Sequence, residues 1–366
     1  MVRLLGRFVR QESPSDDKGA VDAFGKLVAA EWQKRGARTR WIRQAKRGNH
    51  LRVEWPAKTA GGQSGQLLVL GHLDTVYGLG TLKQMPFRVT RGRAFGPGAF
   101  DMKGGLVIAL FAADALAAAR QLPRRRVVFL WTSDEEIGSE TSRALIECEA
   151  RRSVAALVLE PASGLDGRLK TRRKGVGTAE LLVTGCAAHA GLDPETGVNA
   201  IHELALQIER LERLNQPRRG ITVNPTMIDG GTRSNVIPAS ARVVVDLRAG
   251  TRAQMRQIER RLRTLRPILP GAKIEVRGGF SRPPLEHPAS AKLFRNALRL
   301  AEGMGLTIEE SSVGGGSDGN FTAAIGVPTL DGLGAVGEGA HSVHENVIVR
   351  AIPERAALLA GLLATL

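Results

Sequence analysis

The sequence predicts an α/β protein: a mostly parallel sheet flanked by helices, with a smaller ferredoxin-like α+β domain inserted into it. In the first half of the chain, apolar runs typical of buried strands alternate with segments of helical periodicity, an order that favours a parallel sheet covered by helices. From about residue 175 the order becomes β-α-β-β-α-β, which is typical of a ferredoxin-like domain. The alternation of strands and helices resumes later. We therefore expect one α/β domain made of segments 1–174 and 283–366, with an inserted domain at 175–282.

The elements of the first segment follow from apolar spacing. Residues 17–35 place apolar side chains at helical intervals and predict an amphipathic helix. Short continuous apolar runs predict buried strands at Leu67–Leu70, Val127–Trp131 and Ala156–Leu159. Between the first two lies the alanine-rich stretch Gly104–Gln121, which is long enough for a helix of several turns.

The inserted segment combines alternating and helical patterns. Its expected strands are 179–184, 221–228, 241–247 and 273–277, and its expected helices are 197–214 and 252–265. After Arg282 the α/β texture resumes and ends in an expected helix over Pro353–Leu366.

Composition limits the class of protein. At 366 residues with 43% hydrophobic and 24% charged residues, the chain is typical of a globular protein with more than one domain. Cys148 and Cys186 allow no disulfide framework and no CxxC metal motif, so any metal needs His, Asp and Glu ligands. No apolar run approaches the ~20 residues of a membrane span, and the first residues are a poor signal peptide, so we expect a cytoplasmic enzyme.

The net charge of +16 raises the question of nucleic-acid binding. The basic residues are scattered, and the aromatic residues, only 4% of the chain, do not interleave with them as base-stacking platforms would. We therefore expect a solvated basic surface that attracts anionic substrates, with no nucleic-acid or membrane partner.

Metal-ligating side chains recur at the ends of the expected strands and in glycine-rich turns, where sites usually form in open α/β sheets. These side chains are His72, Asp74, Asp101, Glu135, Glu136, Glu160, His341 and His344. Each is weak evidence alone, because a His-x-Asp pair is usually a loop hydrogen bond and paired glutamates suit a helix start. Together they favour a borderline metal such as zinc, with a carboxylate bridging two ions about 3.5–4 Å apart.

The spacing within two motifs suggests separate tasks. Consecutive side chains diverge, so one of Glu135 and Glu136 can bind metal while the other reaches the attacking water. A ligating histidine needs its second ring nitrogen oriented, and Asp74 stands two residues after His72 to do so.

At this point the chain resembles peptidase family M20, the dizinc family of glutamate carboxypeptidases, aminoacylases, acetylornithine deacetylase and succinyl-diaminopimelate desuccinylase. The site motifs that carry the resemblance, in chain order, are GHLDTV, GPGAFDMKGG, SDEEIGS, LEP and GAHSVHE. The lid motifs are AAHAGLDPETGVNAI and GGTRSNVIP. The resemblance covers nearly the whole chain and implies a zinc-exopeptidase-like catalytic domain with an inserted lid and dimerisation domain.

The resemblance implies two Zn²⁺ ions, for which Co²⁺ or Mn²⁺ can substitute. It assigns one ion to His72, Asp101 and Glu160, and the other to Asp101, Glu136 and His341, with Asp101 bridging. It implies a general base at Glu135 and a peptide bond after Asp101 that is often cis.

The same resemblance favours His341 over His344 as the ligand, because the family spacing is a histidine, three residues, then a glutamate, and Glu345 fits only the first.

In the inserted domain, the resemblance implies a histidine, His189, that reaches across a homodimer and donates to the oxyanion of the tetrahedral intermediate. The dimer would form through this domain, which also closes as a lid over the substrate. Asn235 and Arg248 are implied to bind the substrate carboxylate, and the backbone amides of Gly314, Gly315 and Gly316 can form an anion nest.

Within the family, GGGSDGNF and GVPTLDGLGAVGEGAH most resemble the glutamate carboxypeptidase branch, which removes C-terminal acidic residues, including the glutamate of folates. Met102 departs from that branch, which often has an aspartate there, and DMKGG is common among deacylases. We therefore expect a carboxypeptidase acting on small peptides or folate-like conjugates, with N-acyl-amino-acid deacylation as the alternative. A non-catalytic metal- or nucleic-acid-binding protein is a remote alternative, which the intact base Glu135 argues against.

Overall fold

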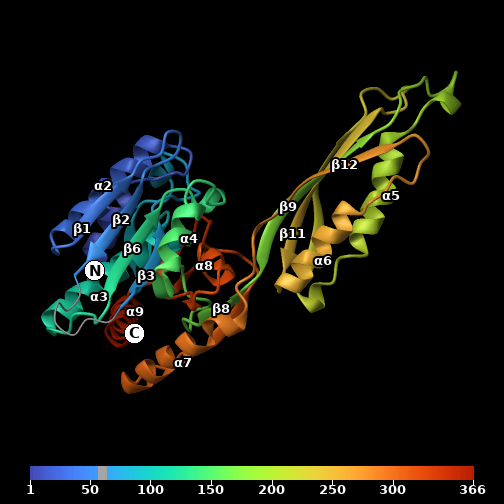
Figure 1. Ribbon diagram of the computed structural model, residues 1–366. Coiled ribbons are helices and arrows are strands. Elements are labelled where there is room, and N and C mark those ends of the chain that lie inside the picture. The colour runs from blue at the N-terminus through green and yellow to red at the C-terminus, as the bar shows by residue number, and fades with distance from the viewer. Residues whose placement is uncertain (57–63) are drawn as a thin grey trace. The chain divides into compact units, whose positions relative to one another are not determined.

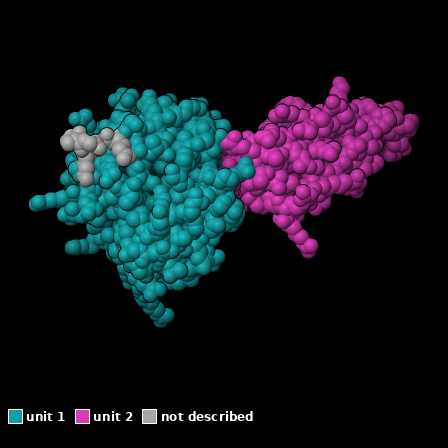
Figure 2. Space-filling model, turned by 60° about the horizontal axis from the view of Figure 1, so that its bottom comes forward, with its two compact units in different colours: residues 1–172, 286–313, 317–366 teal, residues 173–285, 314–316 magenta. Residues whose placement is uncertain are grey.

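The computed structural model describes residues 1–56 and 64–366, which form two compact units (Figures 1 and 2). Unit 1 comprises Met1–Arg172, Glu286–Val313 and Ser317–Leu366. Unit 2 comprises Arg173–Leu285 together with Gly314–Gly316. Each unit has its own hydrophobic core and is described separately.

Unit 1 is built on a six-stranded sheet with the strand order β1-β2-β6-β3-β7-β14. The strands are β1 (Arg38–Ile42), β2 (His50–Trp55), β3 (Gln66–His72), β6 (Arg126–Thr132), β7 (Ser153–Val158) and β14 (Thr329–Leu330). β6, β3, β7 and β14 are parallel to one another, whereas at one edge β2 pairs antiparallel with β6, and β1 pairs antiparallel with β2. The predicted mostly parallel sheet is confirmed, and its expected strands agree with β3, β6 and β7.

Alternate residues of the central strands supply two hydrophobic cores, because successive strand side chains point to opposite faces. Val69 and Phe129 contribute to the core packed by the helices on one face, and Leu68 and Val128 to the core on the other. The first face is covered by α1 (Val2–Arg10), α2 (Lys18–Gln33), α3 (Gly104–Ala118), α7 (His287–Gly303) and α9 (Ala351–Thr365). The second is covered by α4 (Arg143–Arg151) and α8 (Gly319–Ala324).

Helix α2 shows how local sequence sets an element. The Asp17 side chain accepts the backbone N–H of Ala20 and so caps the first turn. The apolar stripe expected from the sequence is buried, and the Trp32 ring packs on Phe129 of β6 with centroids 4.2 Å apart. The helix is thereby held against the sheet by the side chains that predicted it.

Two smaller sheets complete unit 1, and the sequence does not predict them. One has the order β15-β16-β5-β4 and consists of β4 (Arg88–Thr90), β5 (Arg93–Phe95), β15 (Gly337–Glu338) and β16 (Asn346–Ile348). The other pairs β8 (Leu169–Arg173) with β13 (Glu310–Val313). Because Asn346 lies opposite Phe95, the first sheet brings the segment after GAHSVHE beside the start of the GPGAFD turn.

Unit 2 is a four-stranded antiparallel sheet with the order β10-β11-β9-β12. Its elements are β9 (Gly175–Thr184), α5 (Ala200–Glu212), β10 (Thr222–Gly230), β11 (Ser240–Ala249), α6 (Arg252–Arg263) and β12 (Lys273–Arg282). Both helices lie on one face, where alternate residues of β9 and β11 are buried beneath them (Figure 1). This order and packing confirm the predicted ferredoxin-like arrangement.

Two helix starts in unit 2 follow from capping side chains. α5 begins later than expected because Asn199 caps it, its side chain accepting the N–H of His202. α6 begins at a capping box made by Thr251 and Gln254. Over the described ranges no helix combines the length and apolar character needed to cross a bilayer, and both Cys148 and Cys186 are exposed free thiols.

Candidate metal centre

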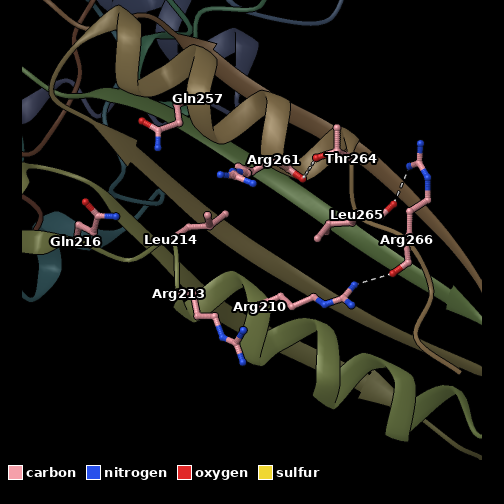
Figure 3. Close-up of a pocket in the computed structure, with 9 residues that line it drawn as sticks. All are labelled: Arg210, Arg213, Leu214, Gln216, Gln257, Arg261, Thr264, Leu265 and Arg266. Atoms are coloured by element: carbon pink, nitrogen blue, oxygen red, sulfur yellow. Dashed lines mark hydrogen bonds between the residues drawn. The ribbon is translucent and has the colours of Figure 1, made fainter.

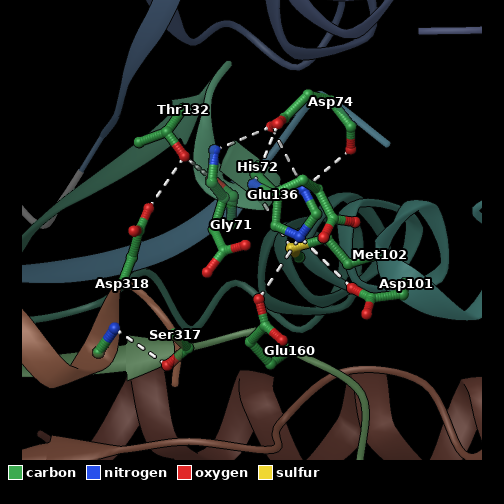
Figure 4. A network of polar contacts seen from close by, with 12 residues as sticks. Gly71, His72, Asp74, Asp101, Met102, Thr132, Glu136, Glu160, Ser317 and Asp318 are labelled. Carbon is green, nitrogen blue, oxygen red and sulfur yellow. Dashed lines mark hydrogen bonds and ion pairs between the residues drawn. The ribbon is translucent and has the colours of Figure 1, made fainter. Parts of the chain in front are cut away.

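Three neighbouring parallel strands deliver polar side chains to one edge of the unit 1 sheet (Figure 4). β3 ends at His72, β6 ends just before a 3₁₀ turn that carries Glu135 and Glu136, and Glu160 follows β7. Because the carboxyl ends of parallel strands meet at the same sheet edge, these side chains converge although they are far apart in sequence.

Asp101 lies between two sets of ligand-type side chains. Its Oδ1 atom is 3.4 Å from Nε2 of His72, which is in turn 3.5 Å from Oε1 of Glu160. Its Oδ2 atom is 3.4 Å from Nε2 of His341, which is 3.2 Å from Oε2 of Glu136. The two oxygens of one carboxylate thus face two different imidazoles, which is the arrangement that a bridging ligand needs.

Three atoms of this cluster are buried and lack a hydrogen-bond partner among the described residues: Nε2 of His72, Oδ1 of Asp101 and Oε1 of Glu136. Such atoms are rare in folded proteins and need an explanation. They belong to a group whose ligand atoms lie within 4.8 Å of one another, and a second such group combines His72, Glu135 and Glu160. Imidazole nitrogen and carboxylate oxygen at this spacing fit metal ions of the zinc type.

The charges of the cluster shift one another's proton affinity. Contacts with Asp101 and Glu136 raise the pKa of His341 to about 10. Burial opposes ionisation of Asp101, but the close contacts with the imidazoles of His341 and His72 outweigh it and hold its pKa far below the usual range. Burial raises the pKa of Glu136. A proton bound to one of these side chains competes with a metal ion for the same ligand atom. Metal binding is therefore expected to release protons.

The sequence predicts that Asp74 orients His72. In the structure, both the backbone carbonyl and the carboxylate of Asp74 lie near the His72 ring. The Nδ1 atom of His72 is 2.9 Å from the backbone carbonyl oxygen of Asp74 and 3.5 Å from its carboxylate. The carboxylate itself accepts the backbone N–H groups of Glu135 and Glu136 at 3.3 and 3.2 Å, and the hydroxyl of Ser15 at 2.8 Å. The carbonyl is thus the nearer partner of the imidazole, and the carboxylate holds the turn that carries both glutamates.

Glu345 is a site residue that sequence reasoning used only as a spacing mark. Its buried carboxylate accepts the backbone N–H groups of Gly98, Phe100 and Asp101 at 3.1, 2.7 and 2.9 Å, and the Tyr77 hydroxyl donates to it. Burial raises its pKa to about 7. The sequence signal for such an acceptor was the glycine-rich turn, because the backbone N–H groups of a buried turn need hydrogen-bond acceptors. Asp101 is followed by a cis peptide bond, as the family resemblance implied.

The two candidate histidines of GAHSVHE lie in different environments. Both are exposed, but His341 contacts Asp101 and Glu136, whereas Nδ1 of His344 lies 3.2 Å from the Ser342 hydroxyl. The structure therefore places His341 within the carboxylate cluster.

The model of peptidase family M20/M25/M40 matches residues 68–365 of this chain. The chain belongs to this family. It is 32% identical over 370 residues to Carboxypeptidase G2 from Pseudomonas sp., covering 99% of this chain and 88% of that protein. It is 31% identical over 317 residues to succinyl-diaminopimelate desuccinylase from Burkholderia ambifaria, covering 81% and 82%. The predicted family and enzyme class, a metallohydrolase of family M20, are therefore confirmed.

Solved structures support the fold of this M20 enzyme. Aminopeptidase PepT from Bacillus cereus matches with a TM-score of 0.82 at 21% identity, covering 99% of this chain and 97% of that one. An M20 family metallo-carboxypeptidase from Sulfolobus solfataricus matches with a TM-score of 0.76 at 18% identity, covering 99% and 98%. At such identities the similarity shows the fold alone.

The remaining predicted site residues belong to unit 2. They are His189, Asn235, Arg248, Gly314, Gly315 and Gly316. His189 is exposed, and its Nδ1 atom accepts the backbone N–H groups of Gly191 and Leu192, both at 3.1 Å. Since Nδ1 is an acceptor, the neutral ring carries its proton on Nε2 and can donate from there. Arg248 is held by the carboxylate of Asp246 at 2.9 Å, and Asn235 is exposed.

Proposed function

We propose that this M20 enzyme hydrolyses an amide bond beside a free carboxylate and releases C-terminal glutamate or a similar residue from peptides or folate-like conjugates. The observation that carries the proposal is the carboxylate of Asp101 shared between two sets of ligand-type side chains. Support for the substrate class comes from the 32% identity with Carboxypeptidase G2 over 99% of the chain. The net charge of +16 suits an acidic substrate.

In this proposal His72, Asp101 and Glu160 hold one metal ion, and Asp101, Glu136 and His341 hold the other. The nitrogen and oxygen ligands suit zinc, and cobalt or manganese can take its place. When bound, the ions would polarise the scissile carbonyl and lower the pKa of the attacking water.

Glu135 is proposed as the general base. As a water molecule attacks the carbonyl carbon, a carboxylate oxygen of Glu135 takes one of its protons. When the C–N bond breaks, Glu135 gives that proton to the departing amine nitrogen, so the residue ends the cycle ionised. The hydrogen bonds of its own and the next N–H to Asp74 hold the base in place.

Unit 2 is proposed to complete the site. His189 donates its Nε2–H to the oxyanion of the tetrahedral intermediate formed in the partner subunit, because its Nδ1 already accepts two backbone N–H groups. Arg248 and Asn235 bind the substrate carboxylate, with the backbone N–H groups of Gly314–Gly316 as additional donors.

A homodimer through unit 2 is supported by an edge strand. β10 forms one edge of its four-stranded sheet, and Met227 and Ile228 on it are 59% and 62% exposed. An apolar edge strand readily pairs with another chain. Replacing both side chains by lysine should yield monomers in sedimentation velocity, whereas lysines at Val154 and Leu165, exposed apolar residues of unit 1, should leave the dimer intact. A β10 variant that still sediments as the wild-type dimer contradicts this interface.

N-acyl-amino-acid deacylation is the second candidate, favoured by a specific residue. Met102 stands in a DMKGG motif common among deacylases, and its sulfur is 3.1 Å from the backbone nitrogen of His72. The 31% identity with a succinyl-diaminopimelate desuccinylase points the same way. Both reactions hydrolyse an amide beside a carboxylate, so they differ in the group accepted and not in the chemistry.

Hydrolysis of a substrate panel by the zinc-loaded protein tests the proposal. The panel is methotrexate, Ala-Glu, Ala-Ala, N-acetylglutamate, N-acetylornithine and N-succinyl-diaminopimelate, each with and without chelator. Chelator-sensitive cleavage restricted to methotrexate and Ala-Glu supports the glutamate carboxypeptidase, and cleavage restricted to the acylated amino acids supports the deacylase. Turnover at the wild-type rate in a Glu135→Gln preparation free of other hydrolases would contradict the assignment of Glu135 as the base.

A further inference from the structure

Unit 2 contains a cavity of about 420 Å³ on its helical face, apart from every residue discussed above (Figure 3). It lies between the end of α5 and the C-terminal half of α6. Four arginines line it: Arg210, Arg213, Arg261 and Arg266. The segment 252–266 contains six arginines and a single carboxylate, Glu259, so the surrounding surface is strongly positive.

Two of these arginines have a structural task. Arg210 donates from Nη1 to the backbone carbonyl of Arg266 at 2.8 Å, and Arg266 donates to the carbonyl of Leu265 at 2.9 Å. These bonds satisfy carbonyls of the segment just after α6 and join α5 to that segment. Stabilisation of that segment therefore accounts for Arg210 and Arg266.

Arg213 and Arg261 have no such task. In the described part of the chain, neither guanidinium forms a hydrogen bond or an ion pair, and both residues are exposed beside the cavity. Two cations at one hollow repel each other, and no carboxylate of the described residues lies within ion-pair distance of either. An incoming anion would supply the missing counter-charge.

The opposite face of the same sheet shows that this lack of partners is not general. There Arg242 contacts Glu180 and Asp229, both at 2.8 Å, and Arg277 contacts Glu275 at 2.7 Å. Arg242 and Arg277 thus have carboxylate partners, whereas Arg213 and Arg261 have none among the described residues.

The cavity shape selects the kind of anion. Its volume lies in the range of about 300–1,000 Å³ typical of small-molecule sites. Apolar surface from Leu214 and Leu265 and the side-chain amides of Gln216 and Gln257 complete the lining, and no aromatic ring is present for base stacking. These features favour a small ligand over a nucleic-acid strand.

We infer that this cavity binds a compact polyanion with two or more phosphoryl groups. A phosphoryl group carries about two negative charges and three acceptor oxygens, whereas a carboxylate carries one charge, so phosphoryl groups match several guanidinium groups within a small volume. Each planar guanidinium can bind such a group in bidentate fashion. Arg213 and Arg261 are the groups left free to do so.

Calorimetric titration with tripolyphosphate at near-physiological salt tests the inference in the zinc-loaded full-length protein. We expect one saturable site per chain, weakened at least about tenfold in Arg213→Gln/Arg261→Gln, since two charge-assisted contacts are lost. The matched control Arg242→Gln/Arg277→Gln removes the same charge from the sheet face and should change the affinity less than about twofold. Tripolyphosphate also chelates zinc, and all three proteins share the metal centre, so the differences among their titrations, and not the heat of any one of them, report binding at the cavity.

Further arms separate the alternatives. Arg213→Lys/Arg261→Lys keeps the charge but not the bidentate geometry and should bind more weakly than wild type and more tightly than the glutamine variant. Unchanged circular dichroism shows that the variants are folded. The inference is overturned by absence of saturable binding, by equal loss in the sheet-face control, by citrate binding as tightly as tripolyphosphate, or by duplex DNA binding that tripolyphosphate does not displace.

Discussion

The metal centre of unit 1 and the arginine-lined cavity of unit 2 both gather charged side chains, but in opposite ways. In unit 1, the His72 imidazole and the carboxylates are largely buried, the His341 imidazole is half exposed, and these groups contact one another and backbone N–H groups. In unit 2, guanidinium groups of one sign surround a hollow, and two of them have no partner among the described residues. The mixed, buried cluster suits a cation that replaces protons, whereas the exposed cluster of one sign suits an anion that supplies counter-charge. Substitutions in the two units should therefore show which residues affect turnover and which affect zinc binding.

Removing the proposed base of the unit 1 cluster should have the largest effect. Glu135→Gln keeps the shape of the side chain but cannot take a proton, so kcat should fall by a factor of about 10²–10⁴. Zinc content measured by mass spectrometry should stay at the wild-type value, because Glu135 is not among the proposed ligands. Glu140→Gln, an exposed control in the same segment, should leave both quantities unchanged. Zinc loss in Glu135→Gln would make Glu135 a ligand.

A change in unit 2 should affect turnover without affecting the metal. His189→Ala removes the proposed oxyanion donor, and kcat should fall by about 10²–10³ while zinc content and melting temperature are unchanged. The matched control is His202→Ala, another exposed histidine of unit 2. Wild-type kcat in His189→Ala would mean that unit 2 contributes no group to the reaction.

The Asp101 turn should be sensitive to a residue that contacts no metal. Glu345→Gln puts an amide where one carboxylate accepts three N–H groups, so zinc affinity should fall by about 10–100-fold as Asp101, the proposed bridging ligand, is displaced. Tyr77→Phe removes only the hydroxyl contact and should have a smaller effect. Competition with a zinc chelator measures both affinities, and equal affinities in Glu345→Gln and wild type would restrict Glu345 to a folding role.

The smallest expected effect is on the pH dependence of the free energy of unfolding, and it depends on a difference between two buried histidines of unit 1. Contacts with carboxylates raise the pKa of His72, whereas burial lowers the pKa of His50, whose ring contacts the hydroxyls of Ser133 and Thr141. Nearby Asp134 and Asp318 oppose that shift but do not overcome it. As pH falls below about 6.5, the unfolded chain gains a proton at His50 that the folded chain resists, so stability falls by at most about 1.4 kcal/mol per pH unit.

His50→Asn should therefore flatten the loss of unfolding free energy between pH 7 and pH 5. Urea unfolding in EDTA, followed by tryptophan fluorescence, isolates this effect because all four tryptophans lie in unit 1. His202→Asn in unit 2 should reproduce the wild-type slope. An unchanged slope in His50→Asn would show that His50 titrates alike in both states.

The parts of the fold that follow from periodicity could be predicted. The apolar runs at β3, β6 and β7 and the stripe on α2 are local patterns, because burial repeats at fixed intervals along a strand or helix. The small sheet of β4, β5, β15 and β16 could not, because strands of two or three residues carry no such repeat and depend on pairing across the chain. Its pairing of Asn346 with Phe95 brings Glu345 to the Asp101 turn.

The sequence by itself determined which chemical groups stand at the strand ends, because parallel strands must bring their carboxyl ends together wherever they pair. Only the tertiary structure decided how those groups meet: which oxygen of Asp101 faces which imidazole, that the carbonyl of Asp74 is nearer to His72 than its carboxylate, and that Glu345 holds the turn. The unpaired state of Arg213 and Arg261 was likewise invisible in the chain, where charges are counted but not placed. Distances between residues far apart in sequence depend on packing, and packing is a property of the folded molecule.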